Sequence, residues 1–75
     1  MKELIEYIAK AIVDQPDAVV VTEETDEQGI RFKLQVADED KGRVIGKQGR
    51  VAEAMRTLLR VTAAKQGTRA TLQIE

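Results

Sequence analysis

The most informative stretch of this sequence is Gly42-Arg43-Val44-Ile45-Gly46-Lys47-Gln48-Gly49-Arg50. Within it, Gly46 and Gly49 flank two polar residues. Because glycine has no Cβ, a backbone with this spacing can approach a bulky polyanion closely. Glycine makes up about 7% of residues in proteins, so a Gly-x-x-Gly pattern is common by chance. Its meaning therefore depends on the elements on either side.

Helices are predicted on both sides of the loop Gly46–Gly49. Before it, Asp38 is a suitable helix cap, and Glu39 and Asp40 in the first turn favour the positive end of a helix dipole. This helix is short because Gly46 ends it. After the loop, helix-forming residues run from position 50 to about position 66. Gly49 thus stands at the start of the longer helix, where free N–H groups and the dipole favour phosphate.

The rest of the chain predicts one more helix and three strands. The helix covers residues 2–14, with apolar residues at helical spacing, and Pro16 ends it. Two strands joined by a turn at residues 25–29 form a hairpin. The element order predicts an α+β fold, a two-layer sandwich in which three helices cover one face of a three-stranded sheet. The predicted strands are Ala18–Thr22, Ile30–Val36 and Ala70–Ile74.

The composition excludes several classes of chemistry. The chain has 75 residues and no cysteine, histidine or tryptophan, so we expect one domain, residues 1–75. Without cysteine or histidine, it lacks the groups for a zinc finger, a cysteine nucleophile or a Ser-His-Asp triad. A domain this small also has little room for a substrate cleft. We therefore expect neither an enzyme nor a bound cofactor or metal.

Charge is distributed unevenly, although the formal net charge is only -1. Residues 1–40 contain four Lys/Arg and eleven Asp/Glu, whereas residues 41–75 contain eight Lys/Arg and two Asp/Glu. The second half is therefore suited to a polyanionic partner, unless the two halves neutralise each other across a solvated surface.

The N-terminus predicts neither a signal peptide nor a membrane span. Glu3 and Glu6 lie inside its apolar stretch, where both kinds of segment require apolar residues. We therefore expect a cytoplasmic protein that does not bind a membrane.

The long helix carries more apolar surface than one sheet needs. Ala52, Met55, Leu59 and Ala63 form one stripe, and a second stripe lies beside it. Together they cover roughly 200° of the helix, where about 100° is enough to pack on a sheet. Unless the short helix and the sheet cover both stripes, the second one predicts an interface with another chain. The candidate dimer residues are Val51, Ala54, Leu58 and Val61.

The candidate site consists of the loop and its flanks. Arg43, Lys47 and Arg50 add positive charge around it, and Val44 and Ile45 predict an apolar floor against which bases could lie. A phosphate-binding P-loop is excluded, because the stretch is one residue short and holds glutamine where the Mg²⁺-binding hydroxyl should be. The alternative is an ordinary helix-turn-helix corner whose glycines serve only the turn.

The run Val44-Ile45-Gly46-Lys47-Gln48-Gly49, followed by apolar Ala52 and Met55, resembles the signature of KH domains. The Gly-x-x-Gly loop of these domains clamps the backbone of about four single-stranded nucleotides. Over nearly the whole chain, the element order is similar to the bacterial type II KH arrangement, α-β-β-α-α-β. With the stretch Gln15-Pro16-Asp17-Ala18, the sequence most resembles the KhpA family of small bacterial single-domain KH proteins. Ala52 departs from the family, which usually has a larger aliphatic residue there.

The resemblance implies single-stranded RNA as the ligand, with Ile45 on the floor of a groove and Arg43 and Arg50 near phosphates. It also implies a central strand at about residues 30–36, antiparallel to the first strand and parallel to the last. Family members form homodimers, pair with a larger KH-containing protein, and are associated with control of cell elongation and the cell envelope. The implied RNA-binding residues are Arg43, Ile45, Gly46, Lys47, Gln48, Gly49 and Arg50.

Two other interpretations stay open from the sequence alone. The chain could be an interaction module that dimerises through its long helix and has little RNA binding of its own. It could also read duplex DNA, with Arg50, Arg56 and Arg60 entering a major groove. RNA binding should depend on the loop, an interaction module on Leu58, and a DNA reader on the helix arginines.

Overall fold

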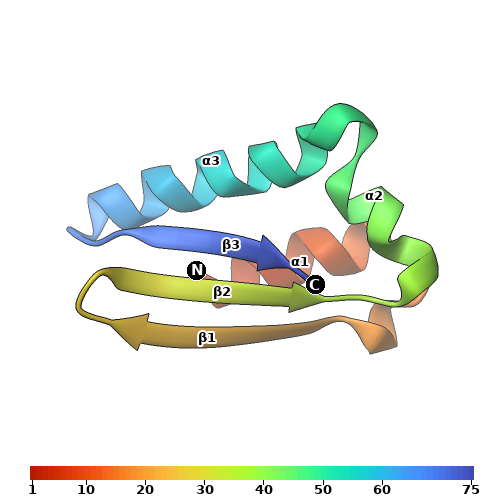
Figure 1. Cartoon of the computed structure of the whole chain (residues 1–75), viewed down its shortest axis with the longest axis horizontal. Helices are drawn as coiled ribbons and strands as arrows, with labels where there is room; N and C mark the ends of the chain where they lie inside the picture. Colours follow the sequence, from red (N-terminus) through yellow and green to blue (C-terminus); the bar gives the residue numbers. More distant parts are fainter.

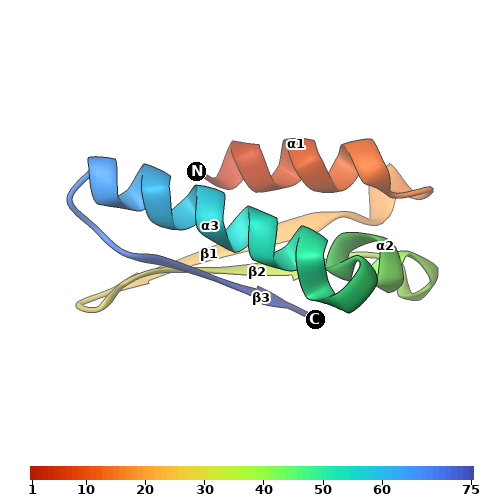
Figure 2. The same cartoon turned by 90° about the horizontal axis from the view of Figure 1, so that it is seen from above.

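The computed structural model describes residues 1–75 as two layers, a sheet and the helices that cover one of its faces. Figures 1 and 2 show α1 and α3 on the same side of the sheet, with α2 at its end. No helix is both long and apolar enough to cross a membrane. The elements are α1 (Lys2–Ile12), β1 (Val20–Asp26), β2 (Gly29–Gln35), α2 (Lys41–Ile45), α3 (Arg50–Lys65) and β3 (Ala70–Ile74).

The sheet has the order β1-β2-β3, with β2 in the centre. β1 pairs antiparallel with β2, and β3 pairs parallel with β2, as the resemblance implied. A parallel pair needs a crossover, and here α2 and α3 provide it. The α-β-β-α-α-β order and the mixed sheet confirm the α+β, type II KH fold.

The core lies between the sheet and the helices. Phe32 and Leu34 of the central strand are almost fully buried, and Ile5 and Ala9 of α1 pack on the same side. The predicted core stripe of α3 is confirmed, because each of its members is buried: Ala52, Met55, Leu59 and Ala63. The opposite face of the sheet carries polar side chains, as the alternation along β2 predicts.

The hairpin is longer than predicted. β1 begins at Val20 and continues to Asp26, and the turn is reduced to two residues. The acidic end of β1 stays in the sheet because Glu24 lies opposite Arg31 and forms ion pairs with Arg31 and Lys33, both at 3.5 Å. Favourable cross-strand pairs of this kind outweigh the low strand propensity of the acidic residues.

The predicted end of the first helix and start of the second are corrected. α1 ends at Ile12, two residues before the predicted end, and Pro16 opens a short 3₁₀ turn instead of stopping the helix. Asp38 does not cap a helix either, since it lies in another 3₁₀ turn that precedes α2. The buried side chain of Asp40, whose contacts are described with the site, explains the first correction.

Candidate nucleic-acid interface

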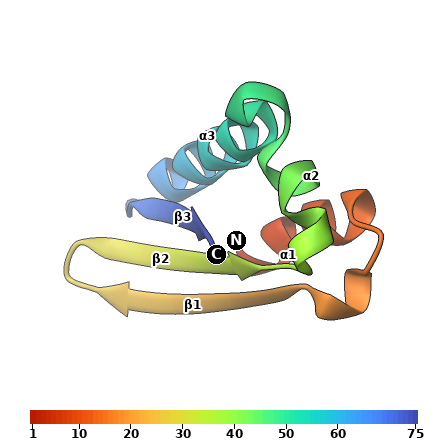
Figure 3. The ribbon, with the colours of Figure 1, turned by 45° about the vertical axis from the view of Figure 1, so that its right-hand side comes forward.

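The loop between α2 and α3 has a backbone that requires glycine. Gly46 has φ 78° and ψ 171°, a region that only glycine adopts readily. Gly49 has φ 75° and ψ 13°, and Gln48 between them is also left-handed at φ 58°. Three positive φ values within four residues turn the chain sharply from α2 into α3 and place the loop on the outside of the molecule (Figure 3).

The two glycines have different surroundings. A Cβ at Gly46 would overlap the side chain of Val51 and lie 2.8 Å from its backbone nitrogen. At Gly49, by contrast, a Cβ would meet nothing within 4 Å. Gly46 is therefore needed for the packing of the loop against α3, whereas Gly49 faces open space where a ligand backbone can approach.

Two basic side chains stand at the loop. Lys47 is exposed and forms no ion pair, so its charge is available to a ligand. Arg50, the first residue of α3, donates a hydrogen bond to the side-chain oxygen of Gln48 at 3.3 Å. No side chain caps the start of α3, and the N–H of Arg50, its first residue, donates a hydrogen bond to the carbonyl of Lys47. The loop thus combines open backbone, positive charge and a helix N-terminus.

Of the two residues predicted to form an apolar floor before the loop, Val44 is wrong and Ile45 remains a candidate. Val44 is completely buried in the core and cannot contact a base. Ile45, the next residue, is 41% exposed beside Gly46 and remains the apolar candidate of the site. The two differ because consecutive residues of a helix point about 100° apart, and α2 has only one side facing the core.

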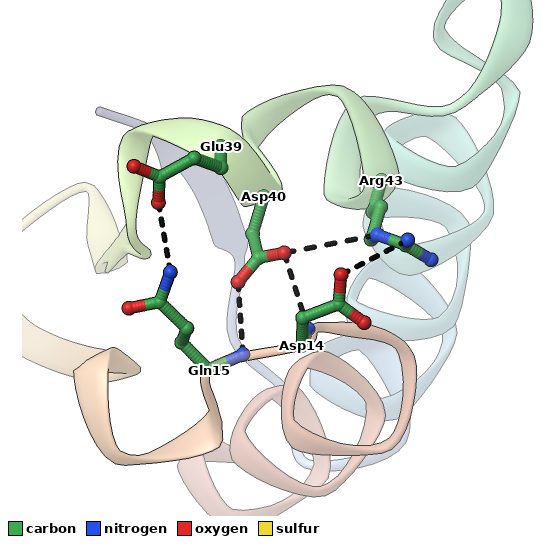
Figure 4. A network of polar contacts seen from close by, with 5 residues as sticks. All are labelled: Asp14, Gln15, Glu39, Asp40 and Arg43. Carbon is green, nitrogen blue, oxygen red and sulfur yellow. Dashed lines mark hydrogen bonds and ion pairs between the residues drawn. The ribbon is translucent and has the colours of Figure 1, made fainter.

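Arg43 lies apart from the loop cations. Its guanidinium is 3.1 Å from the carboxylate of Asp14 and 3.7 Å from that of Asp40, on the side of α2 that faces the end of α1 (Figure 4). Its charge is therefore already balanced by two carboxylates within the protein. No sequence pattern indicated this pairing, because Asp14 and Arg43 are 29 residues apart.

Asp40, which the sequence analysis predicted in the first turn of a helix, lies at the centre of that network. It is the only buried polar side chain, at 1% exposure, and its two oxygens accept the backbone N–H groups of Asp14 at 3.1 Å and Gln15 at 3.0 Å. The Gln15 side chain adds a hydrogen bond to Glu39 at 2.8 Å. These contacts draw the chain out of α1 at Val13, which explains the early end of that helix. They also hold α2 against α1 (Figure 4).

The outer edge of β3 runs beside α3. The backbone N–H of Ile30 bonds to the carbonyl of Arg69, and that of Glu75 bonds to Leu34, so alternate residues of β3 face β2. The backbone groups of Leu72 point away from β2, toward the outer edge of the sheet. The carbonyl oxygen of Leu72 accepts a hydrogen bond from Nε of Arg56 at 3.3 Å. One flank of α3 therefore lies along an unpaired strand edge.

This contact weighs against the duplex-DNA interpretation at Arg56, one of its three arginines, whereas Arg50 and Arg60 are exposed. Only 34% of the Arg56 side chain is exposed, and its guanidinium also pairs with Glu53 at 3.1 Å. An arginine held on its own strand edge cannot extend freely into a major groove, which a DNA-reading helix requires.

The candidate dimer residues differ in exposure. Leu58 is 46% and Val61 51% exposed, and Ala54 is exposed between them. Val51 is only partly exposed, because it packs against the core and the loop glycine Gly46. Three of the four residues thus offer free apolar surface on one side of α3.

No three carboxylate groups come close enough together to form a candidate metal site. The candidate site consists of the loop backbone, the basic side chains beside it and one exposed aliphatic side chain, that of Ile45.

The sequence model of the KhpA/KhpB KH domain matches residues 2–74 of the chain. The protein named RNA-binding protein KhpA in Clostridium acetobutylicum is 53% identical over 74 residues, which are 99% of each chain. The protein of the same name in Caldanaerobacter subterraneus subsp. tengcongensis has the same identity and coverage. The one in Treponema pallidum is 51% identical over 97% of this chain and 91% of its own. No solved structure matches significantly.

Proposed function

This chain belongs to the KhpA/KhpB family of KH domains, and on that premise we propose that it binds single-stranded RNA through the loop Gly46–Gly49. The observation that carries the proposal is the geometry of that loop. It is held open by two glycines, of which Gly49 has free space around it, and it presents the unpaired cation of Lys47. An RNA backbone needs close approach and positive charge together, and both are present here.

We assign different roles to the proposed contact residues. Backbone groups of Gly46 and Gly49 lie against the RNA backbone, with Lys47, Gln48 and Arg50 at the phosphates. Ile45 provides the apolar contact for a base. Arg43 contributes mainly through its ties to Asp14 and Asp40, since its charge is already paired.

The test is fluorescence anisotropy with short labelled single-stranded RNA. The variant Lys47→Asp/Gln48→Asp reverses the charge at the loop, and we expect its affinity to fall by at least about tenfold, which corresponds to about 1.4 kcal/mol. The chain offers a matched control, because the same pair of residue types recurs as Lys65-Gln66 at the exposed end of α3. Lys65→Asp/Gln66→Asp should keep most of the affinity.

If the two double variants bind equally well, the loop is only a structural corner. Duplex DNA of the same length serves as a second ligand. A preference for the duplex would contradict the assignment of single-stranded RNA.

A second function is supported by the exposed apolar side of α3. We propose that Ala54, Leu58 and Val61, with the edge of Val51, form an interface with a second copy or with a larger KH-containing protein. Free aliphatic surface of this kind on so small a domain is a common sign of a protein partner. Acting in the cytoplasm, such an assembly would serve post-transcriptional control of cell elongation and envelope genes.

A further inference from the structure

We propose that the outer edge of β1 binds an extended, basic segment of a partner protein, which joins the sheet as a fourth strand. The sheet order β1-β2-β3 places this edge on the opposite side of the sheet from β3. The inference therefore does not depend on the proposed RNA-binding function, and it gives the chain a partner at a surface that the RNA does not use.

The first observation is that the backbone of β1 is hydrogen-bonded on one side only. Ile30 of β2 donates its N–H to Arg69, so the alternate residues of β2 on either side of Ile30 face β1. In the register of the two strands, their partners are Val20, Thr22, Glu24 and Asp26. The N–H and C=O groups of Val21, Glu23 and Thr25 therefore point outward. None of the turn, loop or side-chain hydrogen bonds involves these outward groups.

The second observation is that nothing blocks this edge. Figures 1 and 3 show β1 at the border of the molecule, with no helix or loop beyond it along its length. The outer edge of β3, by contrast, is contacted by Arg56 of α3. Edge strands are usually protected from pairing by proline, lysine or a bulge. β1 has none of these, because its sequence is Val-Val-Thr-Glu-Glu-Thr-Asp and its pairing with β2 is unbroken over all seven residues.

The third observation is the charge of the segment that contains β1. Residues 14–27 include six Asp/Glu and no Lys/Arg. Asp14 pairs with α2, and Glu24 and Asp26 pair with β2. The exposed carboxylates that form no ion pair lie before, within and after β1, and they are Asp17, Glu23 and Glu27. An edge of this charge attracts a cationic strand and repels nucleic acid.

The same charge disfavours a second copy of this chain as the occupant. Two β1 edges that pair antiparallel about Glu23 would place the two Glu23 side chains directly opposite each other, and like charges in that position are destabilising. A partner strand with lysine or arginine at alternate positions instead places its cations beside Glu23. Its other face then lies beside Val20, which is 49% exposed on the open face of the sheet. Such an added strand is a common mode of peptide recognition.

The experiment uses a synthetic peptide of about eight residues that alternates lysine and valine and is blocked at both ends. Amide hydrogen exchange, followed for each residue by NMR, measures the effect. At about ten times the dissociation constant of the peptide, exchange at Val21, Glu23 and Thr25 should slow by about tenfold, because only the free protein leaves these N–H groups open. The amides of Thr22 and Glu24 already bond to β2, so their exchange should change little.

Two controls separate strand pairing from attraction by charge. The same peptide methylated on all its backbone nitrogens keeps its charge but has no N–H to donate, so it should not protect the outward amides. The variant Glu23→Lys should bind the unmethylated peptide about three- to tenfold more weakly, because an attraction across the strands becomes a repulsion. Glu3→Lys makes the same change at an exposed position on α1 and should bind like the wild type.

The proposal is overturned if the peptide does not bind, if the methylated peptide binds as tightly, or if bound peptide leaves the three outward amides unprotected. Protection of these amides without peptide, rising with protein concentration, would instead identify a second copy as the occupant. Protection by single-stranded RNA would assign the edge to nucleic acid. If RNA fails to bind while the peptide protects the edge, the proposed RNA-binding function is contradicted and this inference stands.

Discussion

At the scale of single residues, the two loop glycines have the same residue type and nearly the same φ but different roles. Gly46 is confined by Val51 and by a ψ that other residues avoid, whereas Gly49 has open space and an ordinary left-handed conformation. The first glycine is therefore required by the packing of the loop, whereas at the second we propose that the RNA backbone approaches most closely. A sequence motif treats both positions alike, and only their neighbours separate them.

Alanine at each glycine should separate stability from binding. Gly46→Ala should lower the free energy of unfolding by about 2–3 kcal/mol, because it adds a clash to a backbone region that alanine avoids. Gly49→Ala should cost about 1–2 kcal/mol, the usual penalty of a left-handed L-residue. It should nevertheless weaken RNA binding, because its methyl group stands where the ligand backbone approaches. Urea unfolding and anisotropy measure the two effects, and equal destabilisation by both variants would contradict this division.

At the scale of elements, Asp40 joins the end of α1 to the start of α2. The N–H groups of Asp14 and Gln15 follow the end of α1 and have no backbone acceptor, so they donate hydrogen bonds to the carboxylate of Asp40. Since α2 leads directly into the loop, this junction fixes one side of the site. A short helix of five residues would not hold its direction through its own hydrogen bonds.

Asp40→Asn should destabilise the protein by about 2–3 kcal/mol, because the amide can accept one of the two N–H groups but turns its own donors toward the other. The matched control is Asp38→Asn, two residues earlier and exposed, which should stay within about 0.5 kcal/mol of the wild type. The free energies come from urea unfolding monitored by circular dichroism. If both variants lose the same stability, the buried carboxylate is not the tie between α1 and α2.

At the scale of the whole molecule, the acidic and basic halves of the chain become different regions of one surface. Glu24 and Asp26 of β1 are paired across the hairpin, and Asp14, just after α1, is paired with Arg43 of α2. Along α3 and the strand beside it, Lys47 and Arg69 form no ion pair and Arg60 forms only a distant one. A polyanion is therefore attracted to one flank of the molecule, although the net charge is -1.

The opposite flank of α3 carries the proposed dimer face. Leu58→Asp should convert a dimer into a species with the mass of one chain, 8.3 kDa, since a carboxylate cannot be buried unpaired between two apolar helices. Thr22→Asp, at an exposed position on the open face of the sheet, should leave the dimer intact. Light scattering coupled to gel filtration reports the mass. An unchanged mass in Leu58→Asp would exclude this surface as the interface.

Much of this protein was determined by sequence alone. The apolar spacing of α1 and α3 and the alternation along β2 predicted the element order and the sheet, because each depends on residues close together in the chain. The Gly-x-x-Gly loop predicted where RNA binds, which stays a prediction. The element limits were less accurate at the α1 exit and in β1, where contacts with other elements decide them.

Only the tertiary structure decided which charged residues are free. Arg43 is balanced by Asp14, 29 residues away, while Arg69 lines the same hollow as Arg60 because β3 runs back along α3. Helix and strand periodicity cannot predict such pairs, because it describes residues that are close together in the chain and the paired residues are far apart. The sequence gives the sign of each charge. Whether that charge is available to RNA depends on whether the fold brings an opposite charge from a distant part of the chain next to it.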